Sequence, residues 1–191
     1  MTELEKMQAG RLYNALDPEI RKVQEATKTL IQEYNHTRPE ETEKRQAILK
    51  SLFGTVGSRV LVENDFKCDF GFNIHIKGRA FIHCNCVMMD SAPINFGNDI
   101  FIGPDCCFVC KELPMNAEER NAGLAYARPI TVEDSVWIGA NCSILGGVTI
   151  GKGSVIGAGS VVVSDIPAGV VAAGNPCRVL HSVEESREKE E

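Results

Sequence analysis

Aliphatic residues recur at every sixth position in the second half of the chain. The members of this unbroken series are Val132, Ile138, Ile144, Ile150, Ile156 and Val162. A period of six fits neither an α-helix, which repeats every 3.6 residues, nor a hairpin meander. It predicts short strands joined by tight turns, three to a coil, in which each aliphatic anchor points inward and stacks on the anchor eighteen residues later.

The same period runs through the middle of the chain with one change of phase. It passes through Phe70, Ile76, Ile82, Met88 and Ile94, then resumes two residues out of phase at Phe96, Ile102 and Phe108. The fourth position after each anchor of the second half is small or branched: Val136, Cys142, Val148, Ser154, Ser160 and Ile166. The pattern therefore predicts a parallel β-helix, with Cys86, Cys106 and Cys142 as small core residues.

Two kinds of residue mark the expected turns. Glycine directly follows three anchors, at Gly139, Gly151 and Gly157, and polar turn residues occur at Asn98, Asp134 and Asn141. We expect both kinds to permit turn conformations that β-branched residues resist.

Residues 1–53 follow a helical pattern instead. Leu4, Met7, Leu12 and Leu16 fall near helical spacing. Asp17 followed by Pro18 predicts a helix N-terminus. Thr37 and Glu40 have the spacing of a capping box, which predicts another helix that ends near Gly54. Charged residues occupy the remaining faces, where we expect them to be solvated.

These patterns divide the chain into three parts. A helical cap is expected over residues 1–55 and a β-helix over 56–181, followed by a charged tail over 182–191. Residues 110–130 interrupt the six-residue period with proline, glycine and asparagine and few apolar side chains. A loop of about twenty residues inside a compact repeat is usually functional or disordered.

Composition excludes several classes of protein. The 191 residues are 43% hydrophobic and 24% charged, which is ordinary for a globular protein. The net charge of −6, without a basic stripe, argues against nucleic-acid binding. No apolar run is long enough for a membrane span, and residues 1–10 contain no apolar segment of a secretory signal, so we expect a cytoplasmic protein with no membrane partner.

Eight cysteines raise the question of disulfides or a metal. Without an export signal, we expect reduced thiols that pack as small hydrophobic groups. Cys107 and Cys110 have the spacing of half a zinc site, but no second pair lies at suitable spacing. A carbonic-anhydrase-like zinc site would need three histidines, and only His75 and His83 are candidates, so we expect no metal.

Seven blocks of sequence between Met7 and Arg178 carry a resemblance. They are Ala9-Gly10-Arg11-Leu12-Tyr13, Tyr34-Asn35-His36, Leu52-Phe53-Gly54, Cys68-Asp69-Phe70-Gly71 with Asn73-Ile74, Val136-Trp137-Ile138-Gly139, Gly147-Val148-Thr149-Ile150-Gly151, and Ala173-Gly174-Asn175-Pro176-Cys177-Arg178. With the hexapeptide repeat and the helical cap, these blocks resemble the maltose and galactoside O-acetyltransferase family.

The resemblance implies a left-handed β-helix, a homotrimer and acetyl transfer from acetyl-CoA to a sugar hydroxyl. Acetyl-CoA is then expected in a groove between neighbouring prisms, with the acceptor at the inner end. A hydroxyl needs a general base to become a good nucleophile. The family supplies a histidine on the long loop before a proline. Here Pro114, Arg120 and Gly123 keep the register, and Leu113 occupies the histidine position.

Two residues are candidates to replace this base. His83 falls where the family has an asparagine that contacts the acceptor, directly after the anchor Ile82, and imidazole changes charge near neutral pH. An acceptor contact or a plain surface position is the alternative for His83. Glu112 lies beside the lost histidine position. The resemblance further assigns acceptor binding to Asp69, His83, Asp90 and Ser91.

The resemblance assigns the acetyl-CoA groove to Trp137, Ala140, Ala158, Ser164 and Arg178. Trp137 is alternatively a trimer-contact aromatic, and the alanines are alternatively small turn residues. Ser164 stands where a lysine often contacts CoA, which predicts fewer phosphate contacts than usual.

The sequence thus favours an O-acetyltransferase-like protein that acts on a sugar or another small hydroxylated acceptor. Because of Leu113, we expect weak or absent activity of the ordinary kind. The alternative is a non-catalytic trimeric relative that binds a sugar or an acyl-CoA.

Overall fold

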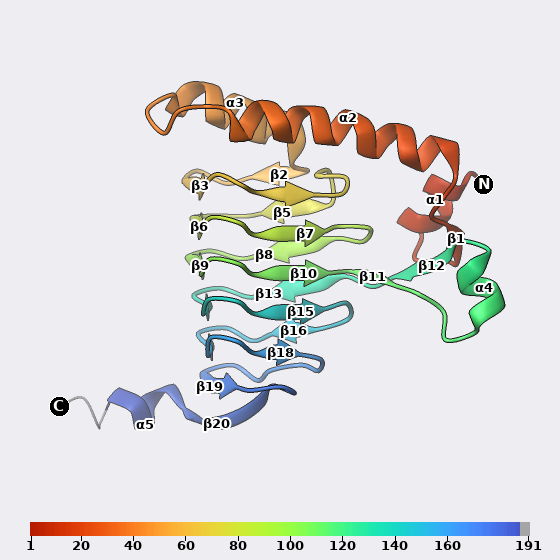
Figure 1. The fold of residues 1–191 in the computed structure, drawn as a ribbon. Helices are drawn as coiled ribbons and strands as arrows, with labels where there is room; N and C mark the ends of the chain where they lie inside the picture. The colour runs from red at the N-terminus through yellow and green to blue at the C-terminus, as the bar shows by residue number, and fades with distance from the viewer. Residues whose placement is uncertain (188–191) are drawn as a thin grey trace.

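The structure, a computed structural model, describes residues 1–187, and its central feature is a stack of three-sided coils (Figure 1). Each coil contributes one strand to each of three parallel sheets. The first face contains β2 (Thr55–Val56), β5 (Ile74–Ile76), β8 (Ile94–Phe96), β13 (Ile130–Val132) and β16 (Thr149–Ile150). The second face contains β3 (Val60–Val62), β6 (Ala80–Ile82), β9 (Ile100–Ile102), β14 (Trp137–Ile138), β17 (Val155–Ile156) and β19 (Val170–Ala173). The third face contains β4 (Lys67–Cys68), β7 (Val87–Met89), β10 (Cys107–Val109), β15 (Ser143–Leu145) and β18 (Val161–Val162).

Strand pairing confirms the predicted stacking of anchors. In the later coils the paired anchors are eighteen residues apart, as in Ile138 opposite Ile156. In the earlier coils they are twenty apart, as in Ile82 opposite Ile102. The two additional residues widen the corner between the third and first faces and account for the change of phase near Phe96.

The column of small residues predicted for the core is also confirmed. Cys86, Cys106 and Cys142 are fully buried, and all eight cysteines are free thiols. The thiol of Cys106 donates to the carbonyl of Gly139 at 3.1 Å. These thiols therefore fill the core and satisfy backbone acceptors of the neighbouring coil.

The explanation predicted for the glycines was wrong. Gly139, Gly151 and Gly157 do not have positive φ. A Cβ added at Gly139 would lie 2.7 Å from the backbone nitrogen of Ala158 in the next coil. Glycine is needed there because neighbouring coils approach closely.

The turns themselves are made by other residues. Of the polar turn residues expected from the sequence, Asn141 alone has positive φ. Within residues 1–187, the other non-glycine residues in that conformation are Asp65, Asn85, Asp99, Asp105 and Ser135. Asp134 instead accepts the backbone amide of Asn98 at 2.8 Å and so ties two coils together.

The helical cap covers the first coil (Figure 1). Its helices are α1 (Glu3–Gln8), α2 (Pro18–Asn35) and α3 (Thr42–Leu52). The predicted start of α2 is confirmed, since Asp17 caps the helix and Pro18 opens it. Two other expectations were wrong. Leu12 and Leu16 lie outside α1, on either side of β1 (Tyr13–Asn14).

The predicted capping box at Thr37 is the second of these errors. The third helix begins at Thr42, and the hydroxyl of Thr37 donates instead to the carbonyl of Tyr34 at the end of α2. Arg38 precedes Pro39, and a residue before proline is disfavoured in helical conformation, so the helix starts later.

Residues 110–130 form an ordered projection rather than a structureless loop. They contain β11 (Lys111–Glu112), α4 (Ala117–Asn121) and β12 (Leu124–Ala127). β12 pairs antiparallel with both β1 and β11, which joins the projection to the N-terminal segment. At the other end of the coils, β20 (Arg178–Ser182) pairs with β19 and α5 (Val183–Arg187) follows. The rest of the predicted charged tail, residues 188–191, lies outside the described residues.

Candidate active site

The corner between the second and third faces carries a column of residues that follow the second-face strands. This corner column consists of Glu63, His83, Gly103, Gly139 and Gly157, together with Ala173, the last residue of β19. Backbone amides of the column donate to backbone carbonyls of the second-face strand in the next coil. The amide of His83 donates to the carbonyl of Ile102 at 3.0 Å, and that of Gly139 to the carbonyl of Ile156 at 2.8 Å. Since neighbouring strands lie about 4.8 Å apart, the column forms a straight strip along the corner.

Below His83, no side chain of the corner column is larger than a methyl group. The next residues along the chain add a parallel row that includes Ala140 and Ala158, and Ala158 is exposed. The corner column therefore presents only glycine and alanine below His83, and it ends at two titratable side chains, Glu63 and His83.

Glu63 and His83 contact each other directly. The Nδ1 atom of His83 lies 2.6 Å from the Oε2 atom of Glu63, and the backbone amide of Cys84 donates to the same oxygen at 3.1 Å. The edge of the His83 ring also packs against Phe81, with ring centroids 5.4 Å apart. The two side chains are 42% and 36% exposed, so the pair is fixed on one side and open on the other.

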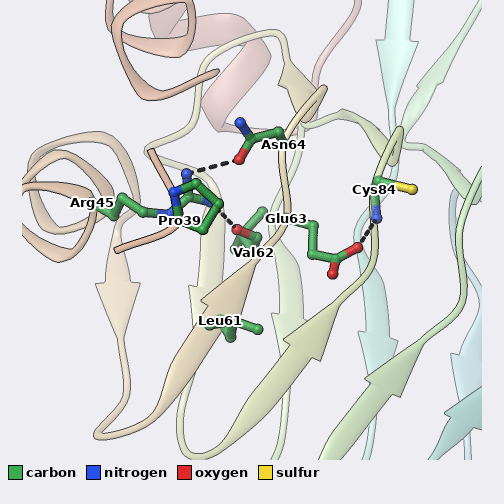
Figure 2. A pocket seen from close by; sticks show the side chains of 7 residues that line it. All are labelled: Pro39, Arg45, Leu61, Val62, Glu63, Asn64 and Cys84. Carbon is green, nitrogen blue, oxygen red and sulfur yellow. Dashed lines mark hydrogen bonds between the residues drawn. The ribbon is translucent and has the colours of Figure 1, made fainter. Parts of the chain in front are cut away.

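Glu63 also lines a cavity of about 320 Å³ beside the helical cap (Figure 2). Arg45 of α3 reaches into this region and is itself buried. It donates to the carbonyl of Val62 at 2.6 Å and to the Oδ1 atom of Asn64 at 2.8 Å. These are the two neighbours of Glu63 in the chain, so Arg45 fixes the backbone that carries Glu63 (Figure 2).

Arg45 was missed by the sequence analysis, which assigned charged residues of the helices to solvent. It makes two further hydrogen bonds, to the hydroxyls of Thr37 and Tyr34. No acidic side chain among the described residues forms an ion pair with it. Four neutral acceptors therefore stabilise this buried guanidinium group.

A second cavity, of about 590 Å³, lies between α2 and the outer side of the third face. Asp69 lines it, together with Lys28 and Met89. Burial raises the pKa of the Asp69 carboxyl, although Lys111 and Lys28 lower it in part. Val87 and Met89 of β7 also line this cavity. His83 lies in the same coil, four residues before β7 begins.

Asp90 and Ser91, the other expected acceptor residues, are inside the protein. Asp90 is 0% exposed, and its Oδ1 atom accepts the backbone amides of Asp69 at 3.0 Å and Phe70 at 2.8 Å. Both residues occupy the corner that the longer early coils widen. Asp90 therefore holds the backbone of Asp69 and Phe70, and Ser91 is 1% exposed beside it.

The residues expected along an acetyl-CoA groove separate into two groups. Trp137 is 57% exposed on the second face, between Phe101 and Val155. It lies beside the corner column, and Arg178 is near the lower end, paired with Ala173. Ser164 lies instead beyond the third face, after β18.

The projection places Leu113 away from the corner column of its own chain, because β11 follows the other edge of the third face. Leu113 is 48% exposed and lies near Met115, which is 88% exposed. Glu112, the second candidate base, forms an ion pair with Arg128. That pairing occupies the carboxylate and disfavours its use as a base.

Three side chains could hold a metal ion. The ligand atoms of Glu63, His83 and Cys84 lie within 4.8 Å of one another, and the sequence analysis did not anticipate this group. In the structure, however, the nitrogen and the oxygen that face each other are engaged in their own contact.

Glu63 itself could have been found from the sequence. Val62 precedes Ile82 by twenty residues, the length of an early coil, but the period of six counted back from Phe70 reaches Asn64 instead of Val62. Among residues 1–187, no helix is both long enough and apolar enough to cross a membrane.

The fold and the corner define the class of this protein as a hexapeptide-repeat β-helix with a helical cap. A family model described as the maltose acetyltransferase hexapeptide capping motif matches residues 6–57. A second, described as bacterial transferase hexapeptide (six repeats), matches residues 129–164. The chain belongs to the maltose and galactoside O-acetyltransferase family, as its relatives show.

Three relatives illustrate the similarity. The galactoside O-acetyltransferase of Escherichia coli is 39% identical over 183 residues, which cover 96% of this chain and 90% of that protein. The crystal structure of a maltose O-acetyltransferase from Clostridium difficile is 42% identical with a TM-score of 0.93, and the match covers 95% of this chain and 97% of that one. A hexapeptide-repeat acetyltransferase of Vibrio cholerae, solved with acetyl coenzyme A, is 38% identical with a TM-score of 0.87, covering 95% and 98%.

Proposed function

We propose that this protein is an acetyl-CoA-dependent O-acetyltransferase that acts on a hydroxyl of a sugar or another small hydroxylated molecule. It works in the cytoplasm as a homotrimer, with sites between subunits. The observation that carries the proposal is the corner column, a smooth strip of glycine and alanine that ends at an open histidine.

The corner column fits the shape of acetyl-CoA. An extended pantetheine arm needs a long, narrow surface without large side chains, and the strip from Gly103 to Ala173 supplies one. Trp137 borders the strip, and Arg178 lies at the end far from His83, where its guanidinium group suits a phosphate. Bound acetyl-CoA supplies an activated thioester for the transfer.

The acceptor would bind near the other end of the strip. The cavity lined by Asp69 is at the level of His83, and carboxylates are good hydrogen-bond acceptors for sugar hydroxyls. This arrangement supports a polyhydroxylated acceptor and does not specify which one.

Exposed apolar side chains support a trimer. Leu61, Phe101 and Trp137 form a row on the outer side of the second face, and all three are exposed. Leu113 and Met115 project from another side. A closed three-fold ring would cover such a row and would bring each projection to the corner column of a neighbour.

Leu113 lowers the expected rate of acetyl transfer. Its side chain has no atom that can accept a proton, so we expect turnover on maltose, galactosides or glucose to be weak. This one residue also favours the second candidate function, a non-catalytic trimer that binds a sugar or an acyl-CoA.

A thiol-release assay with acetyl-CoA and a panel of sugars and other polyols distinguishes the two. Calorimetric titration with CoA and light scattering after size-exclusion chromatography measure binding and mass independently of turnover. Turnover with any hydroxyl acceptor supports the enzyme. CoA binding to a trimer without turnover on any acceptor supports the binding protein, and a monomer that does not bind CoA contradicts both.

A further inference from the structure

We infer that Glu63 is a positioning residue, which holds His83 in the tautomer that lets its Nε2 atom serve as the general base in place of a loop histidine. The inference rests on the proposed acetyl transfer and names the residues that move the proton.

The hydrogen-bond geometry determines the tautomer. The Nδ1 atom of His83 is 2.6 Å from Glu63 Oε2, and an ionised carboxylate carries no proton, so Nδ1 must donate. The backbone amide of Cys84 has hydrogen-bond geometry toward both Nδ1 of His83, at 3.0 Å, and the Glu63 carboxylate, at 3.1 Å. An Nδ1 atom that carries a proton cannot accept this amide, so we assign the amide to the carboxylate. Nε2 of a neutral ring keeps its lone pair.

The pair is held from both sides. Arg45 hydrogen-bonds to the residues before and after Glu63 in the chain, and Phe81 packs against the ring of His83. A base positioned by a third group in this way resembles the arrangement in other acyl-transfer enzymes. The helical cap thereby contributes to catalysis without touching the substrate.

The step at His83 balances in protons and bonds. Nε2 takes the proton of the acceptor hydroxyl as its oxygen attacks the acetyl carbonyl carbon. A C–O bond forms and the thioester C–S bond breaks. The proton on Nε2 then passes to the departing sulfur, which gives CoA thiol and the acetyl ester, and His83 returns to its neutral form. Throughout, Glu63 stays ionised and stabilises the transient imidazolium ion.

The remaining candidates lack this arrangement. Glu112 is paired with Arg128, and Leu113 has no basic atom. A metal on Glu63, His83 and Cys84 would have to break the contact between Nδ1 and Oε2. The described structure therefore favours the hydrogen-bonded pair over a metal site.

The experiment compares Glu63→Gln, Glu63→Asp and His83→Ala with a matched control. Glu133→Gln is that control, because Glu133 also accepts a backbone amide of the next coil, from Lys152 at 2.8 Å, but faces no histidine. Trimer mass, circular dichroism and CoA affinity are measured for each variant. The tautomer of His83 is measured by long-range ¹H–¹⁵N NMR of the ring nitrogens.

We expect Glu63→Gln to lower kcat by about tenfold or more, with little change in the KM for acetyl-CoA. His83→Ala should lower kcat by about 10²-fold and leave CoA affinity unchanged. Glu63→Asp should recover part of the rate, Glu133→Gln should resemble the wild type, and the wild-type spectrum should show the Nδ1–H form.

Several results would overturn the inference. If Glu63→Gln and the wild type have equal kcat, Glu63 does not position the base, although the proposed acetyl transfer is unaffected. An Nε2–H tautomer in the wild type, or zinc bound stoichiometrically and required for turnover, would also overturn it. If the wild type turns over no acceptor, the proposed function and the role of His83 as a base fail together, and the NMR measurement still reports whether the pair exists.

Discussion

The carboxylate of Asp90 accepts the backbone amide of Phe70 through its Oδ1 atom, while its Oδ2 atom has no hydrogen-bond partner within the described structure. Asp90 is completely buried, and this burial raises its pKa to about 6, although the bonded amides lower it in part. The folded protein therefore favours the protonated acid more than the unfolded chain does.

The first prediction concerns the pH dependence of stability. Because the folded pKa lies above the unfolded value, the contribution of Asp90 is fully present below about pH 4 and is lost as the pH rises through 6. The free energy of unfolding of the wild type should fall by about 2 kcal/mol relative to that of Asp90→Asn between pH 4 and pH 8. Urea unfolding at several pH values measures this, and parallel curves for the two proteins would contradict it.

A second prediction concerns the projection. Leu113→His places an imidazole where the family resemblance implies one, and turnover of sugar acceptors should rise by about 10²-fold. Leu113→Gln is the control, since glutamine has similar size and polarity but no basic atom. If Leu113→His binds CoA normally but turns over sugar acceptors no faster than the wild type, the acceptor does not reach the projection.

Close packing between coils gives a third prediction. A Cβ at Gly139 meets the backbone of Ala158, and backbone cannot move aside cheaply, so Gly139→Ala should destabilise the protein by about 2 kcal/mol. Gly153 has φ of +70° and open space around it, a conformation that asparagine tolerates. The free energy of unfolding of Gly153→Asn should therefore lie within about 1 kcal/mol of the wild-type value. Equal losses in the two variants would reject the close-approach argument.

The fourth prediction tests the corner column as a binding surface. Ala158→Leu adds an exposed side chain beside the strip, and the Kd for CoA should rise by about tenfold or more while the unfolding midpoint changes little. Ala168→Leu is its counterpart, since Ala168 is also exposed and packs over Gly151 as Ala158 packs over Gly139, but at another corner. A matching rise in Kd for Ala168→Leu would place CoA elsewhere.

The sequence predicted the coils well because burial in a repeat is periodic. Ile138 and Ile156 face the same core one coil apart, so their spacing reports the geometry directly. It misjudged Gly139 because the contact that requires glycine is with a residue of the next coil, which no local pattern reveals. The order of the projection could not be predicted, because it depends on the pairing of Ala125 with Tyr13, more than a hundred residues away.

The site was predicted less completely. His83 was identified from its place after an anchor, but its partner Glu63 lies one coil earlier, beyond the point where the series had been followed. Arg45 has the same charge as its solvated neighbours on α3, and only tertiary contacts distinguish it. The burial of Asp90 could not be predicted, because it depends on the widened corner, which turns the side chain inward.

The helical cap has a consequence for the protein in a crowded cell. A parallel β-helix ends in a coil whose backbone donors and acceptors could pair with another chain and extend the stack without limit. α2 and α3 lie across that end (Figure 1). Arg45 of α3, which fixes the chain on both sides of Glu63, is also one of the residues that hold this cover on the first coil, so protection against fibrous growth and alignment of the proposed base share a side chain.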